Sequence, residues 1–190
     1  MPAAITDRQR AADRERILGV TEQLVYAEGV RAVGMDRIQQ ATGLSLRRIY
    51  ANFATKDELI AEMLECRDRR WRASLVEHVE QTEDSTERLL VIFEWLEKWF
   101  AKNDFRGCVW LNIHGELGTS SPRVLDRIHQ HKTAFRLQIE KWCDDAGCAD
   151  LASAIYLLAE GATVTAGVTR DASVATHARE AATALLGHRV

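Results

Sequence analysis

The stretch that decides the fold runs from residue 38 to residue 53 and reads Ile38-Gln-Gln-Ala-Thr-Gly-Leu-Ser-Leu-Arg-Arg-Ile-Tyr-Ala-Asn-Phe53. It predicts two short helices that meet at Gly43, where glycine supplies the backbone freedom that a tight corner needs. The apolar side chains that fit the inner faces of the two helices are Ile38, Ala41, Leu44 and Ile49. This pattern is typical of a helix-turn-helix, whose second helix can enter the major groove of DNA.

The rest of the chain is rich in signals for helices and poor in signals for strands. It has 190 residues, the composition of an ordinary soluble globular protein, and only two prolines, Pro2 and Pro122. Residues 3–121 therefore lack this helix breaker, and no stretch shows sustained alternation of apolar and polar residues. We expect an all-α fold of about nine helices, with a helix-turn-helix head of three helices followed by a helical bundle.

Capping residues and polar breaks predict where these helices begin and end. The first three are expected over residues 7–28, 35–42 and 46–52, with Gly29 ending the first and Ser45 capping the third. Thr55 and Glu58 have the spacing of a capping box at the start of a long fourth helix. Later helices are expected beyond the polar break at 82–86, beyond a corner at 103–107, over 122–146, over 151–168 with Asp150 as cap, and from Ser173 to about 187.

Charge is unevenly distributed along the chain. Residues 1–56 contain nine Lys and Arg against six Asp and Glu, whereas residues 57–190 contain 16 against 22. A basic head on an acidic body suits a protein whose N-terminal part alone meets phosphate.

Targeting signals and cysteine usage predict the compartment. The N-terminus lacks the apolar core of a signal peptide, and Glu160 and small polar residues interrupt the most apolar window, residues 151–169. That window favours a helix buried against protein over a membrane span. We expect a cytoplasmic protein with no membrane contact, in which the cysteines default to reduced, buried thiols: Cys66, Cys108, Cys143 and Cys148.

Several motifs at fixed spacings resemble one family of regulators. They are Tyr26-Ala-Glu-Gly-Val30, Ile38-x-x-Ala-x-Gly-Leu-Ser45, Ile49-Tyr-x-x-Phe53 and Lys56-Asp-Glu-Leu59. This head, over residues 14–64, is similar to that of the TetR family of one-component repressors. The resemblance implies a homodimer with a DNA-binding domain at 1–54 and a ligand-binding and dimerisation domain at 55–190. A small-molecule effector would then release a pseudo-palindromic double-stranded operator by preferring a conformation with badly spaced heads.

The same resemblance implies which residues contact DNA. In the family the third helix enters the major groove, and Tyr50 and Lys56 match residues that contact backbone phosphate. Leu46, Arg47 and Arg48 replace a Lys-Gly-Thr-like triplet. Arginine can bond both O6 and N7 of guanine, so we expect at least one of these two arginines to read a base. Ser45 can cap its helix and still offer its hydroxyl to the DNA backbone.

The head also departs from the family pattern. Gly34 stands where the second helix usually opens with Ser or Thr, so that phosphate contact is expected to be lost or moved to the backbone amide of Met35. Gln39 replaces a small alanine, which alters the packing of the second and third helices. Arg14 on the first helix stays open between a DNA contact and ordinary solvation, and Phe53 is expected in the core.

The C-terminal part carries the signals of a ligand pocket. The stretch Gly107-Cys-Val-Trp-Leu-Asn112 with Glu116 is similar to a Gly-Cys-x-x-x-Asn-x-x-x-Glu stretch of one TetR-like subgroup, and in the family this central region lines an inducer pocket. Aromatic walls with a few convergent polar groups suit a small molecule. The expected ligand-binding residues are Trp71, Trp95, Trp99, Trp110, Asn112, His114 and Phe135. The alternative, in which the tryptophans only fill the core, stays open.

No sequence pattern indicates a catalytic or metal site. The chain has no nucleotide-cradling glycine loop, no nucleophile elbow and no paired-histidine metal helix, so we expect neither an enzyme nor a cofactor. His129 and His131 fall on different sides of their predicted helix. In the family the last two long helices form the dimer interface, which here places Leu157, Leu158, Thr165 and Val168 in it.

The sequence thus predicts a DNA-binding transcriptional regulator, in the first place a repressor. The rival hypothesis is a helical ligand-binding or scaffolding protein whose head does not recognise DNA.

Overall fold

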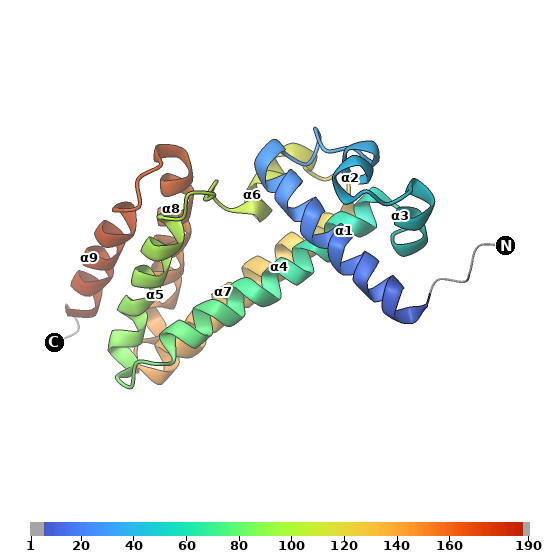
Figure 1. Cartoon of the computed structure of the whole chain (residues 1–190). Coiled ribbons are helices and arrows are strands. Elements are labelled where there is room, and N and C mark those ends of the chain that lie inside the picture. The colour runs from blue at the N-terminus through green and yellow to red at the C-terminus, as the bar shows by residue number, and fades with distance from the viewer. Residues whose placement is uncertain (1–5, 188–190) are drawn as a thin grey trace. The chain divides into compact units, whose positions relative to one another are not determined.

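The computed structural model describes residues 6–187, most of which are helical. Within these residues there are nine α-helices and no strand, which confirms the predicted fold class. The helices are α1 (Asp7–Glu28), α2 (Met35–Thr42), α3 (Leu46–Asn52), α4 (Lys56–Val79), α5 (Ser85–Phe100), α6 (Val109–Leu117), α7 (Pro122–Asp145), α8 (Ala152–Thr169) and α9 (Val174–Gly187). A short 3₁₀ turn, Ala149–Leu151, precedes α8 (Figure 1).

The helices divide between two compact units. The first unit consists of the residues up to Arg67 together with Val109–His129, and so holds α1 to α3, α6 and the beginnings of α4 and α7. The second unit consists of Asp68–Cys108 and the residues from Gln130 onward. The boundary between DNA-binding and ligand-binding domains expected after residue 54 stays a prediction. The two compact units are instead divided within α4 and within α7.

Local capping explains most of the observed helix ends. Thr6 closes a capping box with Gln9 at the start of α1, and Ser45 caps α3 as predicted. The box at α4 closes one residue earlier than the sequence pattern implies, because the Glu58 carboxylate accepts from the backbone amide of Ala54 at 2.8 Å. The predicted cap of α8 is wrong: Asp150 lies inside the 3₁₀ turn, and Leu151 occupies the cap position without a side-chain hydrogen bond.

The core of the first unit joins α1, α2 and α3. Ile17, Ile38 and Ile49, one from each helix, are fully buried, and Phe53 closes the cluster as expected. Ala41, predicted for the inner face of α2, is exposed, and Thr42 is buried in its place. Thr42 tolerates burial because its hydroxyl donates to the carbonyl of Ile38 at 2.8 Å.

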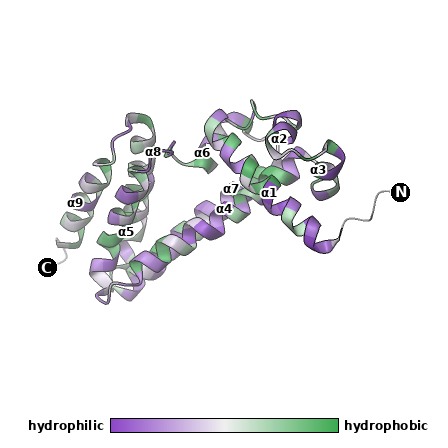
Figure 2. Cartoon of the chain, viewed as in Figure 1, coloured by the Kyte–Doolittle hydropathy of each residue, from purple (hydrophilic) through white to green (hydrophobic). Residues whose placement is uncertain are grey.

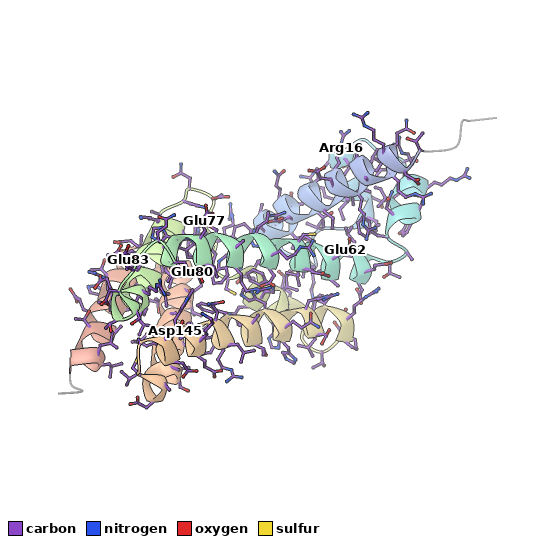
Figure 3. The ribbon with its side chains drawn as sticks, turned by 90° about the horizontal axis from the view of Figure 1, so that it is seen from below. Arg16, Glu62, Glu77, Glu80, Glu83 and Asp145 are labelled. Carbon is purple, nitrogen blue, oxygen red and sulfur yellow. The ribbon has the colours of Figure 1, made fainter. Side chains whose placement is uncertain are left out.

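In the second unit α5, α8 and α9 pack on one another (Figure 1). Small residues allow one close backbone approach, since a Cβ on Gly167 of α8 would lie 2.8 Å from the Cα of Gly107, in the loop between α5 and α6. Hydrophilic and hydrophobic residues both occur along α4 in Figure 2, as expected for a helix with only one packed face. Glu77, Glu80 and Glu83, labelled in Figure 3, are exposed around the end of α4 and contribute to the acidity of this unit.

Candidate nucleic-acid interface

The corner between α2 and α3 has the geometry of a helix-turn-helix. Gly43 ends α2 with a φ of 67° and a ψ of 11°, the left-handed conformation that favours glycine. Two residues later Ser45, in an extended conformation, opens α3 and accepts a hydrogen bond from the backbone amide of Arg48. The corner therefore fixes how α3 leaves α2.

The exposed face of α3 carries two of the predicted DNA contacts. Arg47 is exposed, and Tyr50, three residues on, has 47% of its surface accessible. Residues three apart on a helix lie on one face, so these two side chains project together. Ser45 is exposed beside them, and Leu46 is half-buried.

Arg48 has a different environment from Arg47. Its Nε donates to Oδ2 of Asp13 at 2.9 Å and its Nη2 donates to Oδ1 at 2.6 Å. Asp13 lies on α1 and is only 7% exposed. This two-point pair joins α3 to α1, and sequence reasoning missed it because the two residues are 35 positions apart.

The N-terminus of α2 matches the expected departure from the family. Gly34 occupies the cap position in an extended conformation, and no side chain caps the helix there. A Cβ added at Gly34 would meet no atom within 4 Å, so the space that a serine or threonine would use is open. The first backbone amides of α2, beginning with that of Met35, therefore lack a side-chain cap from residue 34.

Lys56, the predicted phosphate contact, lies against the turn between α1 and α2. Its Nζ donates to the carbonyl oxygen of Val30 at 2.6 Å. Partial burial lowers the pKa of this ammonium, while the charges of Asp57 and Glu116 act in the opposite direction. The Lys56 ammonium therefore stabilises the turn between α1 and α2 in the free protein.

Glu116 of α6 holds the same turn from the other side. Its carboxylate accepts from the backbone amides of Val30 at 3.1 Å and Arg31 at 2.8 Å. Gly29 makes room for it, because a Cβ there would lie 2.8 Å from Glu116 Oε1, and Gly29 also has a φ of 91°. The Glu of the Gly-Cys-x-x-x-Asn-x-x-x-Glu stretch therefore fixes the turn that leads into α2, a role for which the sequence alone gave no signal.

We expect Glu116→Gln to loosen this turn. The neutral amide cannot offer charge-assisted bonds to both backbone amides, so the free energy of unfolding of the first unit should fall by about 1–2 kcal/mol. Hydrogen exchange at the amides of Val30 and Arg31 should accelerate. Glu140→Gln, which breaks an exposed i,i+4 pair with Arg136, serves as control and should change little. Unchanged protection of the two amides in Glu116→Gln would contradict the role.

Arg14, which the sequence left open between DNA and solvent, is a structural residue of the first unit. It pairs with Glu62 of α4, which Figure 3 labels, and its Nη1 donates to the carbonyl of Asn52 at 2.8 Å. Its guanidinium also lies 4.4 Å from the centre of the Phe53 ring. These contacts join α1 to the end of α3 and to α4.

The predicted ligand-binding residues divide between the two units. In the second unit the Trp71 ring lies 5.1 Å from that of Trp95, 5.7 Å from Trp99 and 5.0 Å from Phe135, centre to centre. These four form an aromatic cluster, which His131 joins at 5.2 Å from Trp71. The other three belong to α6 in the first unit, where Trp110 is buried and Asn112 and His114 are exposed.

Polar side chains beside the aromatic cluster were not predicted from the sequence. His131 Nδ1 lies 2.7 Å from Oδ1 of Asp68, which also pairs with Arg72. Burial lowers the pKa of His131, while its hydrogen bond with Asp68 acts in the opposite direction. Burial opposes ionisation of Asp68, but hydrogen bonds from His131 and Arg72 outweigh it and lower its pKa to about 2.

A second ion pair in this unit joins α7 to α8. Lys132 donates to Glu160 at 2.6 Å and lies 3.4 Å from the sulfur of Cys108. Burial works against the charge of Lys132, but Cys108 and Glu160 outweigh it and raise the pKa. Elsewhere in the unit, burial and the neighbouring Cys148 raise the pKa of the Cys143 thiol to about 12, so that thiol stays protonated.

A surface cavity of about 290 Å³ lies between α5 and α9 and contains none of the predicted ligand residues. Charged side chains dominate its lining, which is Phe93, Glu94, Glu97, Lys98, Ala175, Thr176 and Arg179. Over residues 6–187 no three His, Cys, Asp or Glu side chains are grouped so as to hold a metal ion.

Comparison with known proteins identifies the head and the fold. The sequence profile of the bacterial regulatory proteins of the TetR family matches residues 17–63. No curated relative matches the chain in sequence. Among solved structures, a TetR-family transcriptional regulator from Streptomyces coelicolor is 22% identical, with 94% of this chain and 96% of that chain covered and a TM-score of 0.85.

Two further structures are similar over nearly their whole length. A protein from Streptomyces avermitilis that is assigned to the TetR regulators is 28% identical, with 90% and 98% of the two chains covered and a TM-score of 0.77. A protein from Saccharomonospora viridis that is assigned as a transcriptional regulator, solved in complex with choline, is 19% identical, with 94% and 97% covered and a TM-score of 0.75. The head of the chain therefore matches the bacterial regulatory proteins of the TetR family, the fold is that of TetR regulators, and the protein is a DNA-binding transcriptional regulator.

Proposed function

We propose that this regulator is a cytoplasmic homodimeric repressor that leaves a pseudo-palindromic operator when a small molecule binds to its second unit. The observation that carries the proposal is the exposed face of α3, where Arg47 and Tyr50 project from a helix whose other side is held by the Arg48–Asp13 pair. An arginine on a rigid helix is suited to bidentate recognition of guanine in the major groove.

The remaining head contacts would position this helix on the duplex. Tyr50 and Ser45 can donate hydroxyl hydrogen bonds to phosphate, and the backbone amide of Met35 at the uncapped start of α2 can do the same. The charge of Lys56 would attract phosphate at any DNA sequence, while its ammonium also donates to the carbonyl of Val30. Such contacts set orientation and affinity, and Arg47 supplies the discrimination.

The dimer would form through α8. Its exposed apolar residues lie on one stripe, with Leu157 66%, Val164 42% and Val168 80% exposed, and Gly161 lies open between them. Thr165 is exposed on the same side, whereas Leu158 packs partly against the core. The segment Ala149–Thr169 is long and apolar enough to span a membrane, yet only 33% of its apolar window is buried inside the chain. In a DNA-binding regulator, such an exposed apolar stripe would pack against the same helix of a second copy of the chain.

The aromatic cluster of Trp71, Trp95, Trp99 and Phe135 would form the effector site. Its rings offer apolar faces, and the neighbouring Asp68 and Glu160 are already paired with Arg72 and Lys132. Aromatic faces suit an organic cation, and the Saccharomonospora viridis structure holds choline within the same fold. Choline is therefore a rational first probe among small organic cations.

Release would follow from linkage between two sites that share one helix. Trp71 of the aromatic cluster and Lys56 of the head turn both lie on α4. An effector that binds more tightly to a conformation with wrongly spaced heads lowers operator affinity by that differential affinity. Tight binding without such a preference would leave the operator occupied.

A gel-shift titration with genomic fragments tests the proposal. We expect the wild type to retain a small set of fragments and the double variant Arg47→Ala/Arg48→Ala to lose this selectivity. Arg136→Ala, on exposed surface of the second unit, is the control and should bind as the wild type does. If the wild type selects no fragment, with and without candidate effectors, the rival hypothesis of a helical protein that does not recognise DNA takes its place.

A further inference from the structure

Two neighbouring arginines of α3 differ in what they can offer to DNA. Arg47 is exposed, whereas Arg48 gives both Nε and Nη2 to the carboxylate of Asp13. The two bonds are 2.9 and 2.6 Å long, the side-on geometry in which an arginine engages a carboxylate most strongly. Asp13 thus takes the Nε edge of the Arg48 guanidinium, two of its five N–H groups, and holds that group against α1.

The burial of Asp13 disfavours breaking its ion pair with Arg48. The residue is 7% exposed, while the Arg48 side chain is 40% exposed. If DNA drew Arg48 away, the Asp13 carboxylate would remain in a poorly solvated place without its counter-charge, which is strongly unfavourable. The carboxylate also cancels the charge of Arg48, so the pair adds little to the positive field of the head.

Withholding one arginine has a consequence for specificity. A free arginine beside a groove-reading helix contacts phosphate at any sequence and strengthens non-specific binding. Base contacts distinguish an operator from other DNA, whereas phosphate contacts do not. A head in which Arg47 is exposed and Arg48 is paired with Asp13 should therefore have a lower affinity for random DNA. Its ratio of operator affinity to random affinity should be higher.

We infer that Asp13 is a specificity-determining residue of this DNA reader: it sequesters Arg48 on α1 and leaves Arg47 as the only base-reading arginine of α3. The inference rests on the proposed role of α3 at the operator. Asp13 touches no DNA in this account and acts only through Arg48.

The test compares salt dependence on a random duplex and on a fragment that the wild type selects. Asp13→Asn keeps the shape and removes the charge, which frees Arg48. We expect the slope of log K against log salt on random DNA to steepen by about two per dimer, and affinity at low salt to rise roughly 10-fold. The ratio of selected to random affinity should fall. Adding Arg48→Ala to Asp13→Asn should restore the wild-type slope.

A matched control and a second variant separate this role from simple support of the fold. Glu62→Gln breaks the neighbouring Arg14 pair in the same unit and should leave the salt slope unchanged. Asp13→Ala/Arg48→Met replaces the pair by apolar groups, which often preserves folding, and should also keep the wild-type slope. A slope about two lower in that variant would mean that Arg48 already holds phosphate in the wild type and would overturn the inference. An unchanged slope in folded Asp13→Asn would overturn it as well.

Failure of the proposed function gives a different result. In that case the wild type selects no fragment, so no ratio of selected to random affinity exists. If the wild type selects fragments but Asp13→Asn has the wild-type salt slope, the repressor proposal stands. Only the role of Asp13 is then excluded.

Discussion

Arg47→Ala is expected to abolish operator selection while leaving the protein folded. A bidentate arginine–guanine contact is worth about 1–3 kcal/mol of discrimination, and a two-fold dimer loses one contact in each half-site, so the total loss is about 2–6 kcal/mol. That corresponds to a decrease in operator affinity of roughly 30-fold to 10⁴-fold. Fluorescence anisotropy with a labelled operator, beside thermal unfolding of the free protein, measures both quantities.

Arg48→Ala is the matched control, since it removes the same side chain from the next position. It leaves the Asp13 carboxylate without its partner and should lower the free energy of unfolding by about 1–3 kcal/mol. Operator affinity, measured where both variants are folded, should change far less than in Arg47→Ala. Arg47→Ala should therefore lower mainly operator affinity, and Arg48→Ala mainly the free energy of unfolding. The reverse result would assign base reading to Arg48.

Val168→Glu and Leu157→Glu together are expected to separate the dimer. Their side chains are the two most exposed large apolar groups of α8, and a charge on each would have to be buried without a partner in the interface. A monomer engages one half-site only, so operator affinity should fall by about 10²–10⁴-fold through loss of the second, linked head. Sedimentation velocity reports the mass and anisotropy reports the affinity.

Leu185→Glu provides the comparison for this pair. Leu185 is also an exposed large apolar residue, but it lies on α9, outside the α8 stripe. The substitution adds the same charge and should leave the sedimentation coefficient and the operator affinity unchanged. A double α8 variant that still sediments as a dimer would exclude this stripe as the interface.

Local signals in the sequence were sufficient to predict most of the head. The bounds of α1, α2 and α3 agree with the predicted ranges, because each end depends on residues within one turn of it: Gly29, Gly43, and Ser45. Ala41 was misplaced since an alanine at the edge of a helical face is equally compatible with either side. Asp150 failed as a cap because the chain forms a 3₁₀ turn before α8 begins.

Contacts between distant segments could not be predicted in the same way. Glu116 reaches amides 86 and 85 residues earlier, and no local pattern carries that information. The ligand set shows a related limit. Trp110, Asn112 and His114 alternate in sequence, but α6 is a helix, so residues two apart point in different directions and only Trp110 is buried.

The central claim is that Arg47 reads guanine in the major groove, and methylation interference tests it most directly. Methylation of guanine N7 blocks one of the two acceptors that an arginine uses. We predict that methylation at symmetric guanines, one in each half-site, prevents binding of the wild type and has no effect on the residual binding of Arg47→Ala. Wild-type binding that tolerates methylation at every guanine, or an identical interference pattern in Arg47→Ala, would contradict the account.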